Sequence, residues 1–364
     1  MENTPTVPVI AGETNSQNTR EMVSESMPSP AHSQERLELI TARDDDEDDD
    51  GDSAVGDDVA SSTASISSSI LEYRKFQGRT FHSEKYDVEY FTPNDEQQME
   101  SIDISHHYLT LLLDGKLSLA PLKDELEASK VLDIGTGTGI WAIDFADEYP
   151  NAEVIGTDLS PIQSNWVPTN VKFELEDATN SWSWSENSFD FVHMRYLIGA
   201  IADWGALFRE AFRCCKSGGF IESVEVNPTF FSDDETMNDA TAMQTWNRLF
   251  KEGSRAFGRS FCAVEDDVQL LRAAGFVDLQ VTEFKVPVGG WAKDPKLRRV
   301  GQFLRATIEN DLEGYTLIVW QQILGWPKDE YQLFLMEMRK SLRDKNIHGY
   351  IRVRFINARK PKVD

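Results

Sequence analysis

The chain has little cysteine. Its 364 residues include three cysteines, Cys214, Cys215 and Cys262, of which two are adjacent, and no Cys-x-x-Cys pair occurs. An odd number of thiols at this spacing is not a disulfide framework and does not form a set of zinc ligands. We therefore expect a protein of a reducing compartment that holds no structural metal.

Long apolar runs and basic clusters are also missing. No stretch approaches the roughly 18 apolar residues of a membrane helix, and the first twenty residues lack the basic start and apolar core of a signal peptide. The formal net charge is −26, with 36 Lys and Arg against 62 Asp and Glu. Clustered Lys and Arg are what bind phosphate backbones. The sequence thus predicts a cytoplasmic or nuclear protein, not secreted, with no membrane contact and no direct nucleic acid binding.

Half of the net negative charge lies at the start of the chain. Residues 1–70 carry −13, with DDDEDDD at 44–50 and SSTASISSS at 61–69. A segment with so little apolar surface cannot offset the entropy lost on ordering. We predict a disordered acidic, Ser-rich tail at 1–69. A docking role and a merely solubilising role both stay open for it.

Order is expected to begin near Ile70 with a helical N-terminal cap over residues 70–126. A turn at 93–95 is followed by apolar residues three and four positions apart between Ile102 and Leu113. This spacing predicts a helix that begins after the turn.

From residue 130 the apolar pattern alternates between strand and helix. Helices are predicted at 140–148, 203–216 and 264–276. Seven strands are predicted, at 130–135, 152–158, 170–177, 189–195, 220–226, 277–288 and 349–361. This alternation indicates an α/β domain over residues 127–364, with a mostly parallel, Rossmann-like sheet covered on both faces.

Two segments interrupt the alternation, at 229–262 and 289–347. Both have helical spacing and many aromatic residues. We predict that they are helical lid insertions over or beside the carboxyl edge of the sheet, where open α/β sheets bind ligands. Trp246 and Trp291 are candidates for the wall of an acceptor pocket, and packing within the lid is the alternative.

A glycine-rich turn follows the first of the seven strands. The run VLDIGTGTGI places Gly135, Thr136, Gly137 and Gly139 between a strand and a helix. Glycines let a backbone approach a ligand closely, and the helix N-terminus offers N–H groups. A dinucleotide fingerprint, GxGxxG, would carry its third glycine one residue later. A nicotinamide dehydrogenase is therefore the weaker alternative.

Asp133, two residues before the first of these glycines, favours a different cofactor. A carboxylate at this place would repel a pyrophosphate but suits an ammonium group. S-adenosylmethionine carries an ammonium group and a carboxylate and has no phosphates. The turn therefore predicts a site for S-adenosylmethionine.

Two later strands end in acids that fit the adenosine part of this cofactor. Asp158 ends the second strand and can accept both ribose hydroxyls, while Leu159 can lie against the adenine. Asp177 follows the third strand and can accept from the adenine amino group, and the Ala178 N–H can donate to a ring nitrogen. One acid after each of three successive strands predicts an S-adenosylmethionine-dependent methyltransferase with a seven-stranded sheet.

The sequence also resembles a known group, the fungal LaeA-like or TAM-domain methyltransferases. The resemblance extends from about Ser61 to Pro361 and rests on motifs such as SSILEYRKFQGRTFH, VLDIGTGTGIWAIDFADEYPNAEVIGTDLSPIQ and FDFVHMRYLIGAIADW. It implies a class I methyltransferase fold with S-adenosyl-L-methionine at the glycine turn. The motif positions carried over are Asp133, Gly135, Gly137, Gly139, Asp158 and Asp177.

The resemblance implies two functions, and both stay open. Some members of the group are tailoring enzymes of secondary metabolism, which implies a small-molecule or protein methyl acceptor. The member that names the group is a nuclear regulator that acts with velvet-type partners. The acceptor atom, the oligomeric state and the identity of any base are not predicted.

Catalysis needs a base only if the nucleophile must lose a proton. His193, near the end of the fourth strand, is a candidate base, with a supporting role inside the sheet as the alternative. Glu225 on the fifth strand is a second candidate, since a buried carboxylate needs a partner. Tyr90 in the cap could close over the cofactor and exclude water.

Overall fold

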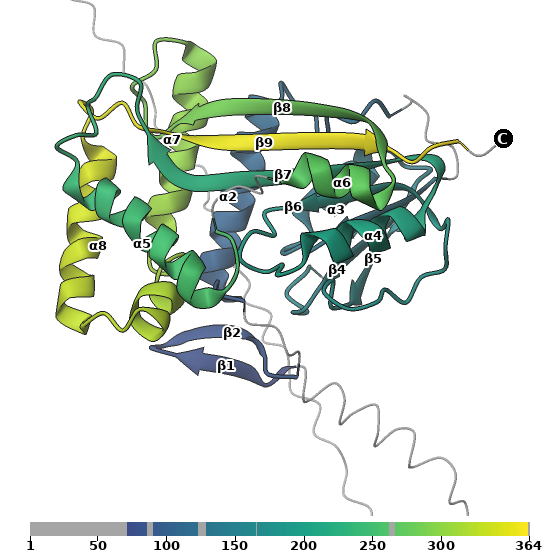
Figure 1. Ribbon diagram of the computed structural model, residues 1–364, viewed down its shortest axis with the longest axis horizontal. Coiled ribbons are helices and arrows are strands. Elements are labelled where there is room, and N and C mark those ends of the chain that lie inside the picture. Colours follow the sequence, from purple (N-terminus) through teal and green to yellow (C-terminus); the bar gives the residue numbers. More distant parts are fainter. Residues whose placement is uncertain (1–70, 86–89, 123–128, 165, 262–265, 363–364) are drawn as a thin grey trace, which may run out of the picture. The chain divides into compact units, whose positions relative to one another are not determined.

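Residues 130–359 build one seven-stranded sheet with helices on both faces (Figure 1). The computed structural model describes residues 71–85, 90–122, 129–164, 166–261 and 266–362. The tail predicted at 1–69 lies outside the described residues, and so does Cys262. The strands of the sheet are β3 (Lys130–Ile134), β4 (Glu153–Asp158), β5 (Val171–Leu175), β6 (Phe189–Arg195), β7 (Cys215–Phe231), β8 (Val277–Pro287) and β9 (Tyr350–Arg359).

The strands are ordered β5-β4-β3-β6-β7-β9-β8 across the sheet. The first five of these run parallel, whereas β9 pairs antiparallel with both β7 and β8. The chain moves outward from β3 to β5 and then crosses back to β6, so the strand order reverses beside β3. Such a reversal opens a crevice at the carboxyl ends of the central strands. The predicted α/β class with seven strands is confirmed.

Apolar residues of the central strands are buried alternately by helices on the two faces. The covering helices are α3 (Ile140–Glu148), α4 (Trp204–Cys214) and α6 (Asp267–Ala274). Val131 of β3 packs with Trp141 of α3, while its neighbour Leu132 packs in the cluster that includes α4 and α6 side chains. Successive side chains of a strand point to opposite faces, so a strand covered on both sides is mostly apolar.

The N-terminal cap contains a β-hairpin that the sequence analysis did not predict. Strands β1 (Tyr73–Phe76) and β2 (Arg79–Ser83) are joined by Gln77 and Gly78, both with positive φ. Strands of four and five residues show too little alternation to stand out from a loop, and the turn lacks the usual Asn-Gly or Asp-Gly pair. The predicted helix is α2 (Glu96–Leu112).

The two segments predicted as insertions contain most of the remaining helices, which we call the lid. The lid helices are α5 (Thr241–Phe257), α7 (Pro295–Asn310), η1 (Ile318–Ile323) and α8 (Lys328–Arg343). The first segment also holds the end of β7, which continues to Phe231 where the sequence analysis ended the strand at 226. Within the described ranges, no helix has the length and apolar character needed to cross a membrane.

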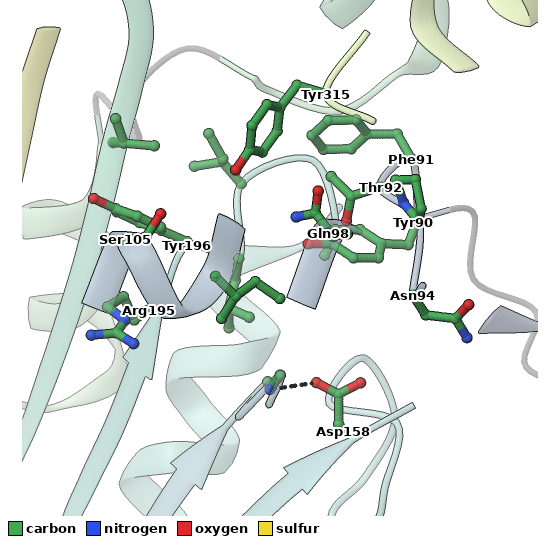
Figure 2. Close-up of a pocket in the computed structure, with 18 of the residues that line it drawn as sticks. Tyr90, Phe91, Thr92, Asn94, Gln98, Ser105, Asp158, Arg195, Tyr196 and Tyr315 are labelled. Atoms are coloured by element: carbon green, nitrogen blue, oxygen red, sulfur yellow. Dashed lines mark hydrogen bonds between the residues drawn. The ribbon is translucent and has the colours of Figure 1, made fainter. Parts of the chain in front are cut away.

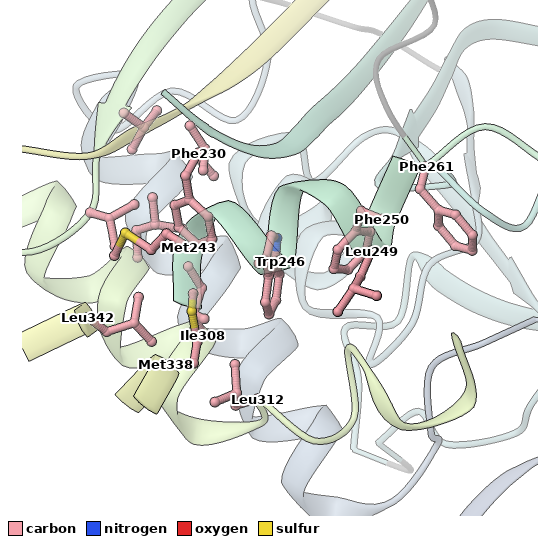
Figure 3. Packing of buried hydrophobic residues seen from close by; sticks show 14 of the residues in the cluster. Phe230, Met243, Trp246, Leu249, Phe250, Phe261, Ile308, Leu312, Met338 and Leu342 are labelled. Carbon is pink, nitrogen blue, oxygen red and sulfur yellow. The ribbon is translucent and has the colours of Figure 1, made fainter. Parts of the chain in front are cut away.

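Aromatic side chains hold the lid together. Trp246 and Phe250 of α5 lie in a buried cluster that also contains Leu312 (Figure 3). The fully buried Trp320 ring stands edge-on to Phe334 at 4.1 Å between centroids. Such aromatic pairs add about 0.5–1.5 kcal/mol beyond the area that they bury. The lid helices therefore share one apolar core with α2 and the end of β7.

A buried arginine ties the hairpin to α2 and to the lid. Arg79 of β2 donates to both carboxylate oxygens of Asp95, the residue that caps α2, at 2.6 and 2.7 Å. It also donates to both oxygens of Asp311, just after α7, at 2.6 and 2.8 Å. The Asp311 side chain is fully buried and accepts the Gly314 N–H as well. One guanidinium thus joins three segments that are separated in sequence.

Removal of this guanidinium should destabilise the fold. In Arg79→Met, Asp311 stays buried without its cation, and we expect a loss of about 3–5 kcal/mol in the free energy of unfolding. Urea denaturation measures this loss. The matched control is Arg343→Met, which removes an exposed pair with Glu309 and should cost under about 1 kcal/mol. Equal losses in the two variants would show that Arg79 does not stabilise the junction.

Candidate active site

A cavity of about 260 Å³ lies at the carboxyl ends of β3, β4 and β6, where the strand order reverses. Its wall comes from the glycine turn, the ends of the strands, the segment that leads into α2, and the lid (Figure 2). Nine of the ten residues that the sequence analysis assigned to the cofactor line it: Tyr90, Asp133, Gly135, Thr136, Gly137, Asp158, Leu159, Asp177 and Ala178.

The tenth, Gly139, does not line the cavity. Gly139 is the N-cap of α3 with φ of 82°, and a Cβ added to it would lie 2.3 Å from Cζ of Phe173 on β5. Gly135 differs, because it lines the cavity and an added Cβ would lie 2.4 Å from Cδ2 of Leu197. The third glycine therefore allows the helix to pack closely on the sheet, and its place at the cofactor stays a prediction.

Asp133 is buried and hydrogen-bonded at both oxygens. Its Oδ2 accepts the Thr136 hydroxyl at 2.6 Å, and its Oδ1 lies 2.7 Å from Nδ1 of His193. A carboxylate only accepts, so the Nδ1 of His193 carries a proton. The carboxylate therefore joins the turn to β6 and still lines the cavity.

Asp158 holds the turn from the β4 side. Its Oδ2 accepts the Gly137 N–H at 2.9 Å (Figure 2), and its Oδ1 accepts the Ser160 N–H at 3.1 Å. Burial raises the pKa of Asp158 to about 6, against the effect of these donors. Each oxygen keeps a lone pair for a further donor, so this carboxylate can hold hydroxyl groups of a ligand.

Asp177 shapes the loop after β5. Its Oδ1 accepts the N–H of Thr179 at 2.9 Å and its Oδ2 accepts from the Asn180 amide at 2.8 Å. The neighbouring Ala178 accepts the Trp182 indole N–H through its carbonyl at 3.1 Å. Among the described residues, no acceptor is hydrogen-bonded to the Ala178 N–H, so this group can donate to a ligand.

Neither residue proposed from the sequence as a base lines the cavity. His193 is 1% exposed, its ring stacks on Trp141 at 3.7 Å between centroids, and burial lowers its pKa. Glu225 accepts the N–H groups of Leu197 and Ile198 at 3.0 and 3.1 Å. Both side chains lie behind the wall of the cavity, so the structure does not support them as bases that touch an acceptor.

The sequence analysis missed several residues that line the cavity. Arg195 is the last residue of β6 and Tyr196 follows it, and the Tyr196 hydroxyl is hydrogen-bonded to that of Tyr108 on α2. Tyr196 has φ of 58°, a conformation that costs a non-glycine residue energy and is concentrated at functional sites. The signal was its position directly after a central strand. Trp246 lines the cavity as suggested, whereas Trp291 donates its indole N–H to Gly349 at 2.9 Å and does not.

Two buried amide oxygens, on residues that line this cavity, have no hydrogen-bond partner in the described residues. They are Oε1 of Gln98, 4% exposed, and Oδ1 of Asn94, 8% exposed. Both residues line the cavity (Figure 2). Buried polar atoms are almost always hydrogen-bonded. The wall therefore fits a ligand that brings hydrogen-bond donors, as the ammonium and hydroxyl groups of S-adenosylmethionine would.

The fold and the site define a class of protein. The strands follow this order in the sheet, β9 is antiparallel to its neighbours, and a glycine turn flanked by acids follows β3. This is the architecture of a class I S-adenosylmethionine-dependent methyltransferase. A model of the family described as "Methyltransferase domain" matches residues 104–281.

Relatives identify the family within this class. The "Methyltransferase pytC" of Aspergillus terreus is 34% identical over 305 residues, which are 84% of this chain and 93% of that protein. The "Secondary metabolism regulator LAE1" of Cochliobolus heterostrophus is 32% identical over 78% of this chain and 94% of its own length. The "Protein-methionine methyltransferase laeA" of Emericella nidulans is 30% identical over 80% of this chain and 77% of its own length. The chain belongs to the LaeA-like family of fungal methyltransferases, and its cofactor is S-adenosyl-L-methionine.

Buried Glu222, on the same strand as Glu225, generates a pH prediction. It accepts the Leu119 N–H at 2.8 Å, its other oxygen has no partner in the described residues, and burial raises its pKa from 4.5 to about 7. When the pKa of an acid is higher in the folded than in the unfolded state, its protonated form stabilises the fold. This stabilisation is complete below the pKa of the unfolded state and is lost as the pH rises through the pKa of the folded state. As the pH rises from 5 to 8, this single group should lower the free energy of unfolding by about 2–3 kcal/mol.

We therefore expect Glu222→Gln to flatten the pH dependence of stability. Its free energy of unfolding should fall less than that of the wild type between pH 5 and pH 8, measured by urea denaturation at each pH. Glu337→Gln, on the exposed side of α8, should follow the wild type. A Glu222→Gln curve parallel to the wild type would show that Glu222 is ionised in both states.

Proposed function

We propose that the protein transfers the methyl group of S-adenosylmethionine to a small, largely apolar acceptor that binds beneath the lid. The observation that carries this proposal is the continuity of the cavity. One space is lined both by the acid-flanked glycine turn and by aromatic lid residues, and we assign the turn to a cofactor end and the lid to an acceptor end. A cofactor and an acceptor bound there would share one enclosed site.

At the cofactor end, the residues that line the cavity fit the parts of S-adenosylmethionine. Asp158 has lone pairs for the ribose hydroxyls, and Asp177 with the Ala178 N–H suits the adenine edge. Asp133 places a negative charge where the ammonium group would lie, and His193 acts through Asp133 as a positioning residue. Bound there, the cofactor supplies an electrophilic methyl group on a sulfonium.

At the acceptor end, the wall is mainly apolar. It comes from Phe91 before α2, from Phe230, Trp246 and Phe250 at the end of β7 and on α5, and from Ile308 on α7. Ligand sites of this kind bury an apolar body and orient it by a few polar groups. This composition favours a compact aromatic or alicyclic metabolite over a charged one.

Two tyrosine hydroxyls are among the polar groups of the wall, and we assign them to this end. Tyr108 and Tyr196 share one hydrogen bond, so one of the two O–H groups stays free to donate to an acceptor oxygen. Burial raises the pKa of Tyr196 well above 10, so the pair is neutral and donates. The protein's contribution is then orientation of the acceptor atom toward the methyl group, which can supply much of the rate acceleration.

A second candidate function comes from the relatives. The Cochliobolus relative is named as a regulator of secondary metabolism, and the Emericella relative is named as a protein-methionine methyltransferase. The alternative is therefore a nuclear regulator that methylates protein or acts through velvet-type partners. An exposed protein side chain would have to enter the cavity past the lid.

The experiment that separates the two uses full-length protein and S-adenosylmethionine with an isotope-labelled methyl group. It is incubated in parallel with an organic extract and with a protein extract of a fungal culture. We expect the label in a small apolar product. Label that appears only in protein would overturn the small-molecule proposal, while no label in either extract with no bound cofactor would overturn the methyltransferase site itself.

Tyr196→Phe tests the acceptor end separately. Loss of one neutral hydrogen bond is worth about 1 kcal/mol, so we expect kcat/KM for the acceptor to fall roughly 5- to 10-fold with no change in the affinity for S-adenosylhomocysteine. The Phe keeps the same strained backbone, so the comparison isolates the hydroxyl. Tyr350→Phe, whose hydroxyl donates to Asp233 outside the cavity, should match the wild type. An equal loss in both variants would rule out orientation by the tyrosine pair.

A further inference from the structure

Arg195 is a cation in the wall of the cavity that no carboxylate pairs. It ends β6 and lines the cavity. The charge of Asp133 acts on it, but no ion pair joins the two side chains in the described residues. Arg79, Arg213 and Arg359 each donate to a carboxylate. For Arg195, the described part of the chain offers no carboxylate oxygen within 4.0 Å.

The protein partner of Arg195 is neutral. Its Nη1 lies 3.3 Å from Nδ1 of His106 on α2, and Nε2 of His106 lies 2.8 Å from Asp144. Burial lowers the pKa of His106, so this ring is uncharged near neutral pH. Its Nε2 then donates to Asp144 and its Nδ1 accepts from Arg195. In the described part of the chain this long bond is the one found for the guanidinium, which has five N–H donors, so donors remain for a ligand.

Arg195 is partly buried, and a cation that is partly removed from water without a counter-ion lowers the stability of the fold. Removal from water also lowers the pKa of Arg195, against the attraction of Asp133. A wall that keeps such a charge is suited to an anion that enters with the ligand. Guanidinium matches a carboxylate well, because its planar fork gives two parallel hydrogen bonds.

We propose that Arg195 binds the α-carboxylate of the methionine head of S-adenosylmethionine. This inference rests on the proposed cofactor site. Asp133 and Arg195 both line the cavity, one negative and one positive, and the head is a zwitterion with one ammonium and one carboxylate. The two side chains come from neighbouring strands, β3 and β6. Together they distinguish an adenosyl amino acid from an adenosine that lacks the amino-acid part.

The second source of a carboxylate is the acceptor, and the experiment separates the two. Calorimetry on the full chain compares S-adenosylhomocysteine, which has the amino-acid head, with 5′-methylthioadenosine, which lacks it. In Arg195→Gln we expect the affinity for S-adenosylhomocysteine to fall roughly 10- to 100-fold, as for one charged contact, while the affinity for 5′-methylthioadenosine changes less than about twofold. Arg195→Lys, which keeps a point charge, should lie between.

Two controls make the result specific. Asp158→Asn should weaken both ligands alike, because the ribose is common to them. Thermal unfolding of Arg195→Gln without ligand should be unchanged or shifted upward, since an unpaired charge is removed, whereas a merely structural arginine would lower the midpoint.

Three outcomes would overturn the inference. Equal loss of both ligands in Arg195→Gln would mean that the arginine acts through the fold. No loss of S-adenosylhomocysteine, with a raised KM for the acceptor alone, would assign the anion to the acceptor. A wild-type chain that binds 5′-methylthioadenosine as tightly as S-adenosylhomocysteine would have no carboxylate subsite. If the wild type bound neither ligand, the cofactor site itself would fall with it.

Discussion

Two carboxylates that hold a glycine turn organise the site. Asp158 accepts the Gly137 N–H from β4, and Asp133 joins the Thr136 hydroxyl to the His193 ring on β6. The turn is thereby fixed to the strands on both sides of β3. Because the strand order reverses at this place, the bonds that stabilise the junction also present both carboxylates to the cavity. The lid completes the cavity, and its position relative to α2 depends on Arg79.

The distribution of ionisable groups follows from strand geometry. Residues inside a covered strand point into packed helices, so His193 and Glu225 become buried supports for Asp133 and for the loop after β6. Residues at a strand's carboxyl end leave the sheet and face the crevice. Arg195 and Tyr196 stand at that point of β6. At the end of β6, the groups available to a ligand are therefore a cation and a hydroxyl. The two residues predicted as bases instead form hydrogen bonds to residues that line the cavity.

Much of the fold was predictable because its signals are local. The seven strands, the glycine turn and the acids after three strands each depend on spacing within a few residues, and nine of the ten cofactor residues line one cavity. The β-hairpin was missed because four- and five-residue strands carry little periodicity. The packing role of Gly139 was not predictable, because its neighbour, Phe173 on β5, comes from a distant segment.

The sequence by itself determined the α/β class, the order of strands and helices along the chain, and the position of the turn, since backbone preferences and apolar periodicity act over short distances. Only the tertiary structure decided which side chains share the cavity. The pairing of Arg79 with Asp311 joins positions 232 residues apart. The choice of Arg195 and Tyr196 over His193 and Glu225 depends on which strand ends meet and which faces the helices cover. Such contacts arise from three-dimensional packing, for which no spacing along the chain is diagnostic.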